Sequence, residues 1–111
     1  MNSWNIPIEL ERQIRNRDKK CVYCGKDFKD DETIEHIDNN IQNISVENLA
    51  ICCRACNASK GQKNISEWLE SDYCKSKNIT TDSVADVIKN ALKCFLEHLL
   101  FFIREIISKH Y

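Results

Sequence analysis

The chain has 111 residues and a formal net charge of −1, so it is long enough for one domain, and its charge alone does not indicate a nucleic-acid-binding surface. Only two glycines and one proline, together with 30% charged residues, favour a folded and rather helical chain over a disordered one. The seven cysteines are odd in number, and residues 1–20 have no apolar core of the kind that a signal peptide needs. The composition therefore predicts a cytoplasmic protein with reduced thiols and a structural metal.

The N-terminal half predicts a compact ββα unit preceded by a helix. Residues 7–17 are expected to form a short helix, with Pro7 in its first turn. A β-branched, alternating stretch predicts a short strand at 33–37, and 46–51 is either a second strand or the approach to the next turn. A helix is expected from Cys53 until Gly61 interrupts it.

The C-terminal part is predicted to be helical. A helical turn is expected at 66–70, capped by Ser66, with Trp68 and Leu69 facing inward. A long helix follows at 81–111, capped by Thr81 or Asp82. Its apolar stripe is wide, and its charged residues argue against a membrane span. The helix either wraps across the ββα unit or pairs with a second copy, and a homodimer is favoured. We divide the chain into a core with its N-terminal helix at 1–65 and a helical extension at 66–111, within one compact domain.

Two Cys-x-x-Cys pairs enclose the most informative stretch of the sequence. Each pair can place two sulfurs on one tetrahedral cation, and together they predict a Cys₄ zinc site. The four expected zinc ligands are Cys21, Cys24, Cys53 and Cys56. Cys52 is expected in the core, and Cys74 and Cys94 are expected to bind no metal. Between the pairs, Glu35 precedes His36, and a histidine beside a carboxylate suggests phosphodiester chemistry.

These features occur in an order that resembles the HNH endonuclease family. The outline comprises an arginine-rich approach, CVYCG, TIEHI, ENLAICCRACN and a trailing lysine, and it covers about residues 11–63. The resemblance implies an α+β fold: a small zinc-stapled ββα-metal (His-Me finger) core, here with an N-terminal helix and a long C-terminal helix. It also implies a metal-dependent enzyme that hydrolyses phosphodiester bonds in DNA.

The resemblance assigns catalytic roles to three residues of this chain. His36 would be the general base that activates water, because imidazole titrates near neutral pH. Glu35 and Asn57 would hold a catalytic Mg²⁺ or Mn²⁺ and leave positions open for phosphate and water. The acid is glutamate where aspartate is commoner in the family, and asparagine stands at the third position in place of histidine.

Other residues are assigned supporting roles. Asn48 matches the family's middle asparagine, which fixes the loop and so orients the base. Lys60 matches the trailing lysine, and we expect it to contact nucleic acid together with Arg54, which lies inside the second cysteine pair, and Lys63, which follows it.

Two other functions remain open from the sequence. The first is a non-catalytic zinc-knuckle module that binds DNA or protein without cutting. The second is an interaction protein whose working surface is the helix from Val84 to Ile107. Loss of DNA cleavage in a folded, zinc-loaded His36→Ala protein would exclude both.

Overall fold

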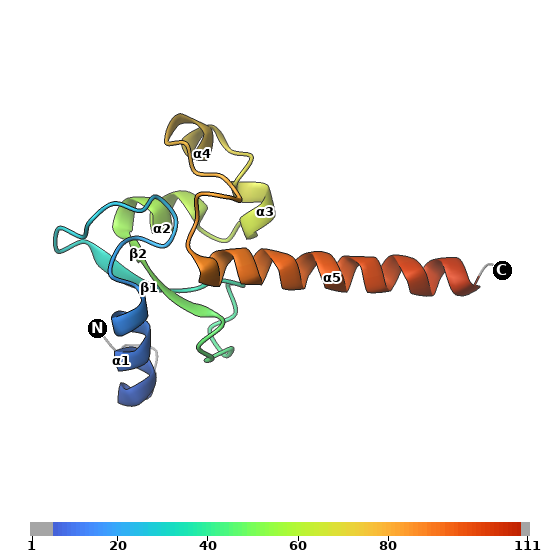
Figure 1. Ribbon diagram of the computed structural model, residues 1–111, viewed down its shortest axis with the longest axis horizontal. Helices are drawn as coiled ribbons and strands as arrows, with labels where there is room; N and C mark the ends of the chain where they lie inside the picture. The colour runs from blue at the N-terminus through green and yellow to red at the C-terminus, as the bar shows by residue number, and fades with distance from the viewer. Residues whose placement is uncertain (1–5, 110–111) are drawn as a thin grey trace.

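A computed structural model describes residues 6–109, and Figure 1 shows a small globular part from which one long helix projects. The elements, in chain order, are α1 (Ile8–Arg17), β1 (Glu32–His36), β2 (Leu49–Cys53), α2 (Arg54–Lys60), α3 (Ile65–Trp68), α4 (Asp72–Ser76) and α5 (Asp86–Lys109). The predicted helix at 7–17 and the predicted helix between Cys53 and Gly61 are confirmed within one residue at each end.

The two strands form an antiparallel sheet whose register runs from Glu32 opposite Cys53 to His36 opposite Leu49. The second strand starts at Leu49, three residues later than the start of the predicted stretch at 46–51, because residues 37–48 form a loop. Helix α2 follows β2 without a linker, and this completes the expected ββα unit (Figure 1).

Alternate residues of β2 pack on opposite faces of the sheet, as strand geometry requires. Leu49 and Ile51 belong to a cluster with Ile14 of α1, whereas Ala50 and Cys52 belong to a larger cluster on the other face. The sheet is therefore covered on both sides, and it is buried along the whole of β2. Cys52 is a core residue, as predicted, and so is Cys74.

The first cysteine turn is joined to both the sheet and α5 by backbone hydrogen bonds. The Val22 amide donates to the Ile51 carbonyl at 3.2 Å, and the Ala85 amide donates to the Val22 carbonyl at 2.9 Å. The residue that ends this turn is Gly25, with φ of 75°, a backbone angle that favours glycine. These bonds fix the turn against the base of α5.

The segment between α2 and α5 contains two short helices, of which only the first was predicted. Trp68 in α3 is fully buried, and Leu69 is buried beside it, as expected. The cap of α3 is Asn64, whose side chain accepts from the Glu67 amide, so the predicted Ser66 cap is wrong by two residues. Ser71 caps α4 in the same way.

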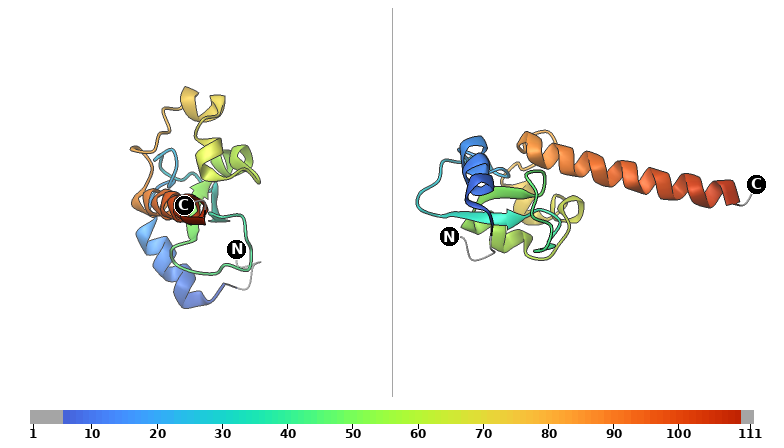
Figure 2. Two further views of the ribbon diagram at one scale, coloured as in Figure 1. Left: turned by 90° about the vertical axis from the view of Figure 1, so that its right-hand side faces the viewer. Right: turned by 90° about the horizontal axis from the view of Figure 1, so that it is seen from below.

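Helix α5 starts at Asp86 and not at 81, because residues 80–83 form a turn in which the Thr80 amide donates to the Ser83 hydroxyl. Only its first turns pack on the core, through Val87 and Ile88, with Ala91 and Leu92 half-buried. The rest projects into solvent in all three ribbon views (Figures 1 and 2), so α5 does not wrap across the ββα unit, and the favoured alternative, a homodimer, stays a prediction. Within residues 6–109 no helix combines the length and apolar character needed to cross a membrane.

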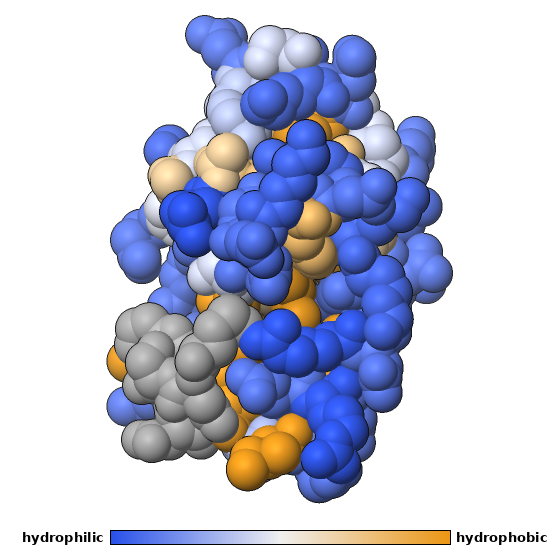
Figure 3. Space-filling view, turned by 90° about the vertical axis from the view of Figure 1, so that its left-hand side faces the viewer, coloured by the Kyte–Doolittle hydropathy of each residue, from blue (hydrophilic) through white to orange (hydrophobic). Residues whose placement is uncertain are grey.

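Hydrophilic side chains cover most of the face of the globular part that is turned away from α5 (Figure 3). Apolar residues show there only in small patches, in contrast to the projecting helix.

Candidate metal centre and adjoining acid–base site

The four predicted zinc ligands meet at one point beside the sheet. The Sγ atoms of Cys21, Cys24, Cys53 and Cys56 all lie within 4.8 Å of one another, and the distance from Cys24 Sγ to Cys53 Sγ is 3.9 Å. Four sulfurs at a Zn–S distance of about 2.3 Å in a tetrahedron are about 3.8 Å apart. The thiols are therefore positioned for a metal ion without rearrangement of the backbone.

Backbone amides already support negative charge on these sulfurs. The Cys53 amide donates to Cys21 Sγ at 3.3 Å, and the Cys56 amide donates to Cys53 Sγ at 3.4 Å. A hydrogen bond from Cys56, with help from backbone amides, lowers the pKa of Cys21 to about 4, and the same sulfur–sulfur contact raises the pKa of Cys56. Because the thiolate is the form that binds metal, the cluster is prepared for a cation.

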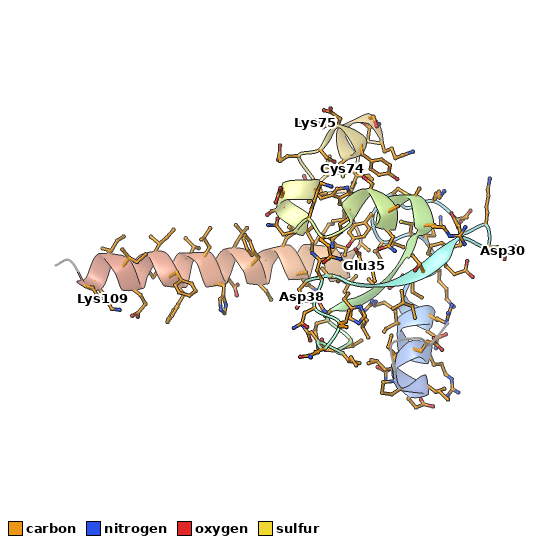
Figure 4. All side chains as sticks on the ribbon, turned by 180° about the vertical axis from the view of Figure 1, so that it is seen from behind. Asp30, Glu35, Asp38, Cys74, Lys75 and Lys109 are labelled. Atoms are coloured by element: carbon orange, nitrogen blue, oxygen red, sulfur yellow. The ribbon has the colours of Figure 1, made fainter. Side chains whose placement is uncertain are left out.

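Glu35 lies on β1 near the centre of the fold (Figure 4), and its side chain contacts Lys60 of α2. Its Oε1 lies 3.0 Å from the Nζ of Lys60, and its Oε2 accepts a hydrogen bond from the Tyr23 hydroxyl. The Glu35 side chain is 5% exposed and the Lys60 side chain 0%. A lysine is fully buried only when it is paired, and here the second partner of the ammonium is Asn39 Oδ1, at 2.8 Å.

Burial raises the pKa of the Glu35 carboxyl, although the Lys60 charge and the hydrogen bonds from Tyr23 and Lys60 oppose that shift. Burial also raises the pKa of Tyr23, and the neighbouring Glu35 charge adds to this. The group is thus a buried carboxylate whose charge is balanced by one ammonium.

This arrangement corrects one prediction and limits another. Lys60 does not reach the surface, so it cannot contact nucleic acid as the structure stands. Glu35 does not fit a divalent ion as arranged here, because both of its oxygens have partners and an ammonium lies against one of them. Glu35 could accept a metal ion only if Lys60 moved away.

His36 is the last residue of β1, and its side chain is buried. Burial lowers the pKa of the imidazole, although the charge of Asp38 acts in the opposite direction. The imidazole is therefore neutral at pH 7, which is the form that can accept a proton.

The loop that follows His36 is held by two side chains. Asn48 Oδ1 accepts from the Asp38 amide at 3.0 Å, and its Nδ2 donates to Asp38 Oδ1 at 2.9 Å and to the Asn43 carbonyl at 3.0 Å. Partial burial acts to raise the pKa of Asp38, but hydrogen bonds, the largest from Asn43, lower it overall. The predicted loop-fixing contacts of Asn48 are present in full.

The remaining predicted site residues lie on or just after α2. Asn57 is half-buried, and Arg54 and Lys63 are exposed. The Arg54 guanidinium donates to the Asp30 carbonyl at 3.5 Å, and Lys63 Nζ donates to the Ser59 carbonyl at 3.4 Å. Both charges stay accessible to a partner, whereas the charge of Lys60 does not.

Three residues of the site were not singled out from the sequence. Tyr23 lies inside the first cysteine turn, where its aromatic character alone predicts packing. Asp38 and Asn39 stand in a polar stretch that reads as a turn. The only sequence signal for Asp38 is its position two residues after His36. No sequence signal marks Asn39, whose backbone φ of 65° and whose hydrogen bond from Lys60 are known only from the structure.

Comparison with known proteins agrees with this geometry. Residues 21–63 match a family model described as HNH endonuclease. No curated protein matches the chain significantly. The matched stretch begins at the first zinc-ligand candidate and ends after α2, so this part of the chain is similar to HNH endonucleases, and the predicted small α+β fold is confirmed.

Proposed function

We propose that this chain, whose residues 21–63 match the HNH endonuclease family model, is a metal-dependent endonuclease that hydrolyses phosphodiester bonds in DNA. The observation that carries the proposal is the placement of a buried, neutral His36 at the end of β1, within the matched stretch, beside a loop fixed by Asn48. The match to the family model supports nuclease chemistry, and the side-chain geometry supports the identity of the base.

His36 is proposed as the general base that takes a proton from the attacking water. An efficient base has a pKa near or below the working pH, so that the unprotonated form predominates. The lowered pKa of His36 meets this condition, and the nearby carboxylate of Asp38 would stabilise the imidazolium as it forms.

Asn48 is proposed as a positioning residue. It holds the backbone two residues beyond His36 through the Asp38 amide, and its own carbonyl accepts from the Ile37 amide at 2.7 Å. These bonds bracket His36 on its C-terminal side, and a misplacement of about 1 Å in a catalytic group can cost on the order of 100-fold in rate.

The thiol cluster is proposed to hold a structural zinc ion. Zinc on four thiolates has no open position for substrate, so it would stabilise the fold and take no part in hydrolysis. It would join the first cysteine turn to the β2–α2 junction, which are the segments that present Tyr23 and Lys60 to Glu35.

A catalytic Mg²⁺ or Mn²⁺ remains part of the proposal, with Glu35 and Asn57 as its ligands, as the family resemblance implies. Such an ion would neutralise charge on the phosphoryl oxygens and the leaving oxygen. It requires Lys60 to leave Glu35. DNA is the proposed substrate, and Arg54 and Lys63 are the proposed contacts with its phosphates because their charges are accessible.

The test is conversion of supercoiled plasmid by zinc-loaded protein, with and without Mg²⁺ or Mn²⁺, using His36→Ala and a Lys75→Ala control. Lys75 lies exposed on α4, outside the candidate site, so its removal should leave cleavage unchanged. Metal-dependent nicking that is lost only in His36→Ala supports the proposal. Equal cleavage by both variants would remove His36 as the base.

A DNA-binding module without cleavage is the second candidate, and the Glu35–Lys60 ion pair favours it, because it neutralises the expected metal ligand. Two results would together support this binding module. Folded, zinc-loaded protein would cut no plasmid with any divalent ion, and the parent and His36→Ala proteins would bind DNA equally well.

A further inference from the structure

The projecting part of α5 carries far more apolar surface than a solvated helix tolerates. Every residue from 93 to 109 is exposed. The large apolar side chains on this part are 44–61% exposed: Phe95, Leu96, Leu99, Leu100, Phe101, Phe102, Ile103, Ile106 and Ile107. A helix with this composition is normally covered, because an uncovered patch of this size leads to association.

The area matches what a second copy of the same helix would bury. Six of these side chains, Phe95, Leu96, Leu99, Phe102, Ile103 and Ile106, lie on one side of the helix. They expose roughly 600 Å² per chain, on the order of 100 Å² each, so a symmetric pair would bury about 1,200 Å². Stable specific interfaces bury about 1,200–2,000 Å² in total. A second copy is therefore sufficient to cover this side of α5.

We infer that two copies of this chain associate through α5, with the two helices antiparallel about a twofold axis near residues 100 and 101. The apolar residues that follow the spacing of a two-helix seam are Leu92, Phe95, Leu99, Phe102 and Ile106. Steps of three and four residues along the helix place them in one line. In an antiparallel pair, Leu99 contacts Phe102 of the second copy, and Phe95 contacts its Ile106, each contact occurring twice by symmetry.

The flanking residues agree with this register. It brings Leu96 beside Ile103 of the second copy on one side of the seam, and His98 beside its Glu105 on the other. The first is an apolar contact, and the second pairs a carboxylate with a group that carries positive charge when protonated. No like charges face each other across the seam.

The hollow at the base of α5 favours the antiparallel over the parallel arrangement. An open cavity of about 650 Å³ lies between the 37–48 loop, α3 and the first turns of α5, and its α5 wall includes Val87, Ala91, Leu92 and Phe95. In the antiparallel pair, the C-terminal end of the second copy's α5, including its Ile106, lies over this cavity. A parallel pair would direct both helix ends away from it. The antiparallel pair also keeps the two globular parts at opposite ends, with the starts of α5 roughly 45 Å apart.

The first test is the mass of the full-length, zinc-loaded protein by light scattering. The expected value is twice the chain mass of 13.0 kDa, and the Leu99→Glu/Phe102→Glu variant should fall to a single chain mass. Lys93→Glu is the matched control, because it changes the charge of α5 away from the seam and should leave the dimer intact. Circular dichroism confirms that each variant is folded.

The second test is the orientation of the pair, measured by spin labels on the native Cys94. This thiol is exposed, whereas the other six cysteines are buried or half-buried. An antiparallel pair separates the two Cys94 positions by roughly 20 Å along the axis, whereas a parallel pair places them at the same height, with no separation along the axis. A distance below about 15 Å overturns the antiparallel arrangement.

Other occupants give different results in the same experiments. A single-chain mass at 100 µM protein, with α5 binding to phosphatidylcholine vesicles, would overturn the dimer in favour of a lipid surface. A mass of three or four chains would overturn the two-helix arrangement. None of these outcomes depends on nuclease activity.

Discussion

Replacement of Lys60 by methionine is expected to destabilise the protein strongly, because it leaves the buried Glu35 carboxylate with the Tyr23 hydroxyl as its remaining partner. The ion pair has an N–O distance of 3.0 Å, which gives an attraction of about 5.5 kcal/mol at an effective dielectric constant of about 20. Desolvation of the two ions costs several kcal/mol each and offsets most of this gain. Removal of one partner nonetheless costs about 3–5 kcal/mol, because the other charge stays buried and uncompensated.

The assay is urea denaturation of zinc-loaded Lys60→Met, Glu35→Gln and the double variant. Each single variant should lose about 3–5 kcal/mol, whereas the double variant should lie within about 1–2 kcal/mol of the parent, because no isolated charge remains. Lys63→Met is the matched control, since Lys63 is exposed, and its combination with Glu35→Gln should be additive. Single variants that each cost less than about 1 kcal/mol, with an additive double variant, would refute the buried pair.

The same variant tests whether Glu35 can hold a divalent ion. Lys60→Met removes the ammonium that competes for the carboxylate, so Mg²⁺ or Mn²⁺ should raise its melting temperature more than that of the parent. An ion at 100 times its dissociation constant stabilises the protein to which it binds by about 2.7 kcal/mol. If saturating metal stabilises neither protein, Glu35 is not a metal ligand, and the binding module without cleavage becomes the better proposal.

Further predictions concern the thiol cluster, the loop and the pH dependence of stability. Chelation of zinc, or Cys56→Ser, should unfold the ββα unit in circular dichroism, while Cys94→Ser leaves it folded; a stable Cys56→Ser protein would contradict a structural metal. Asn48→Ala should cost about 2–4 kcal/mol in urea denaturation, because it removes three side-chain hydrogen bonds from a buried position, and a loss below about 0.5 kcal/mol would show that the loop holds itself. Since burial lowers the pKa of His36 below 6.5, the unfolded chain takes up a proton first as the pH falls. Stability should therefore decrease below pH 6.5 more in the parent than in His36→Gln, and a pH-independent difference between their melting temperatures would contradict the shift.

The order of elements and the zinc-ligand set could be predicted because their signals are local. Strand alternation at 33–37, the spacing of the cysteine pairs and Gly61 after α2 each act within a few residues of chain. Element boundaries were less accurate where capping decided them. Asn64 and Ser66 are both good N-cap residues, and the choice between them depends on which side chain reaches the Glu67 amide.

The partners of Glu35 could not be predicted in the same way, because they come from three separate segments. Tyr23 belongs to the first cysteine turn, Lys60 to the end of α2, and Asn39 to the loop after β1. From the sequence, a lysine that follows a metal-binding motif is expected to contact phosphate. The packing of α2 on the sheet instead buries Lys60 against Glu35. The helical character of the C-terminal segment was predictable from its periodicity, but neither its start at Asp86 nor its direction away from the core was, since an apolar stripe does not specify which surface covers it.

Helix geometry links the buried lysine to the proposed metal site. Asn57 and Lys60 are three residues apart on α2, so their side chains lie on the same face of the helix. Because that face carries Lys60 to Glu35, a metal ion shared by Glu35 and Asn57 would occupy nearly the same space as the ammonium. The carboxylate can therefore be neutralised by the lysine or by a divalent ion, but not by both in one arrangement. It follows that Lys60→Met should tighten metal binding while Lys63→Met leaves it unchanged, and equal metal affinity in the two variants would place any catalytic ion elsewhere in the site.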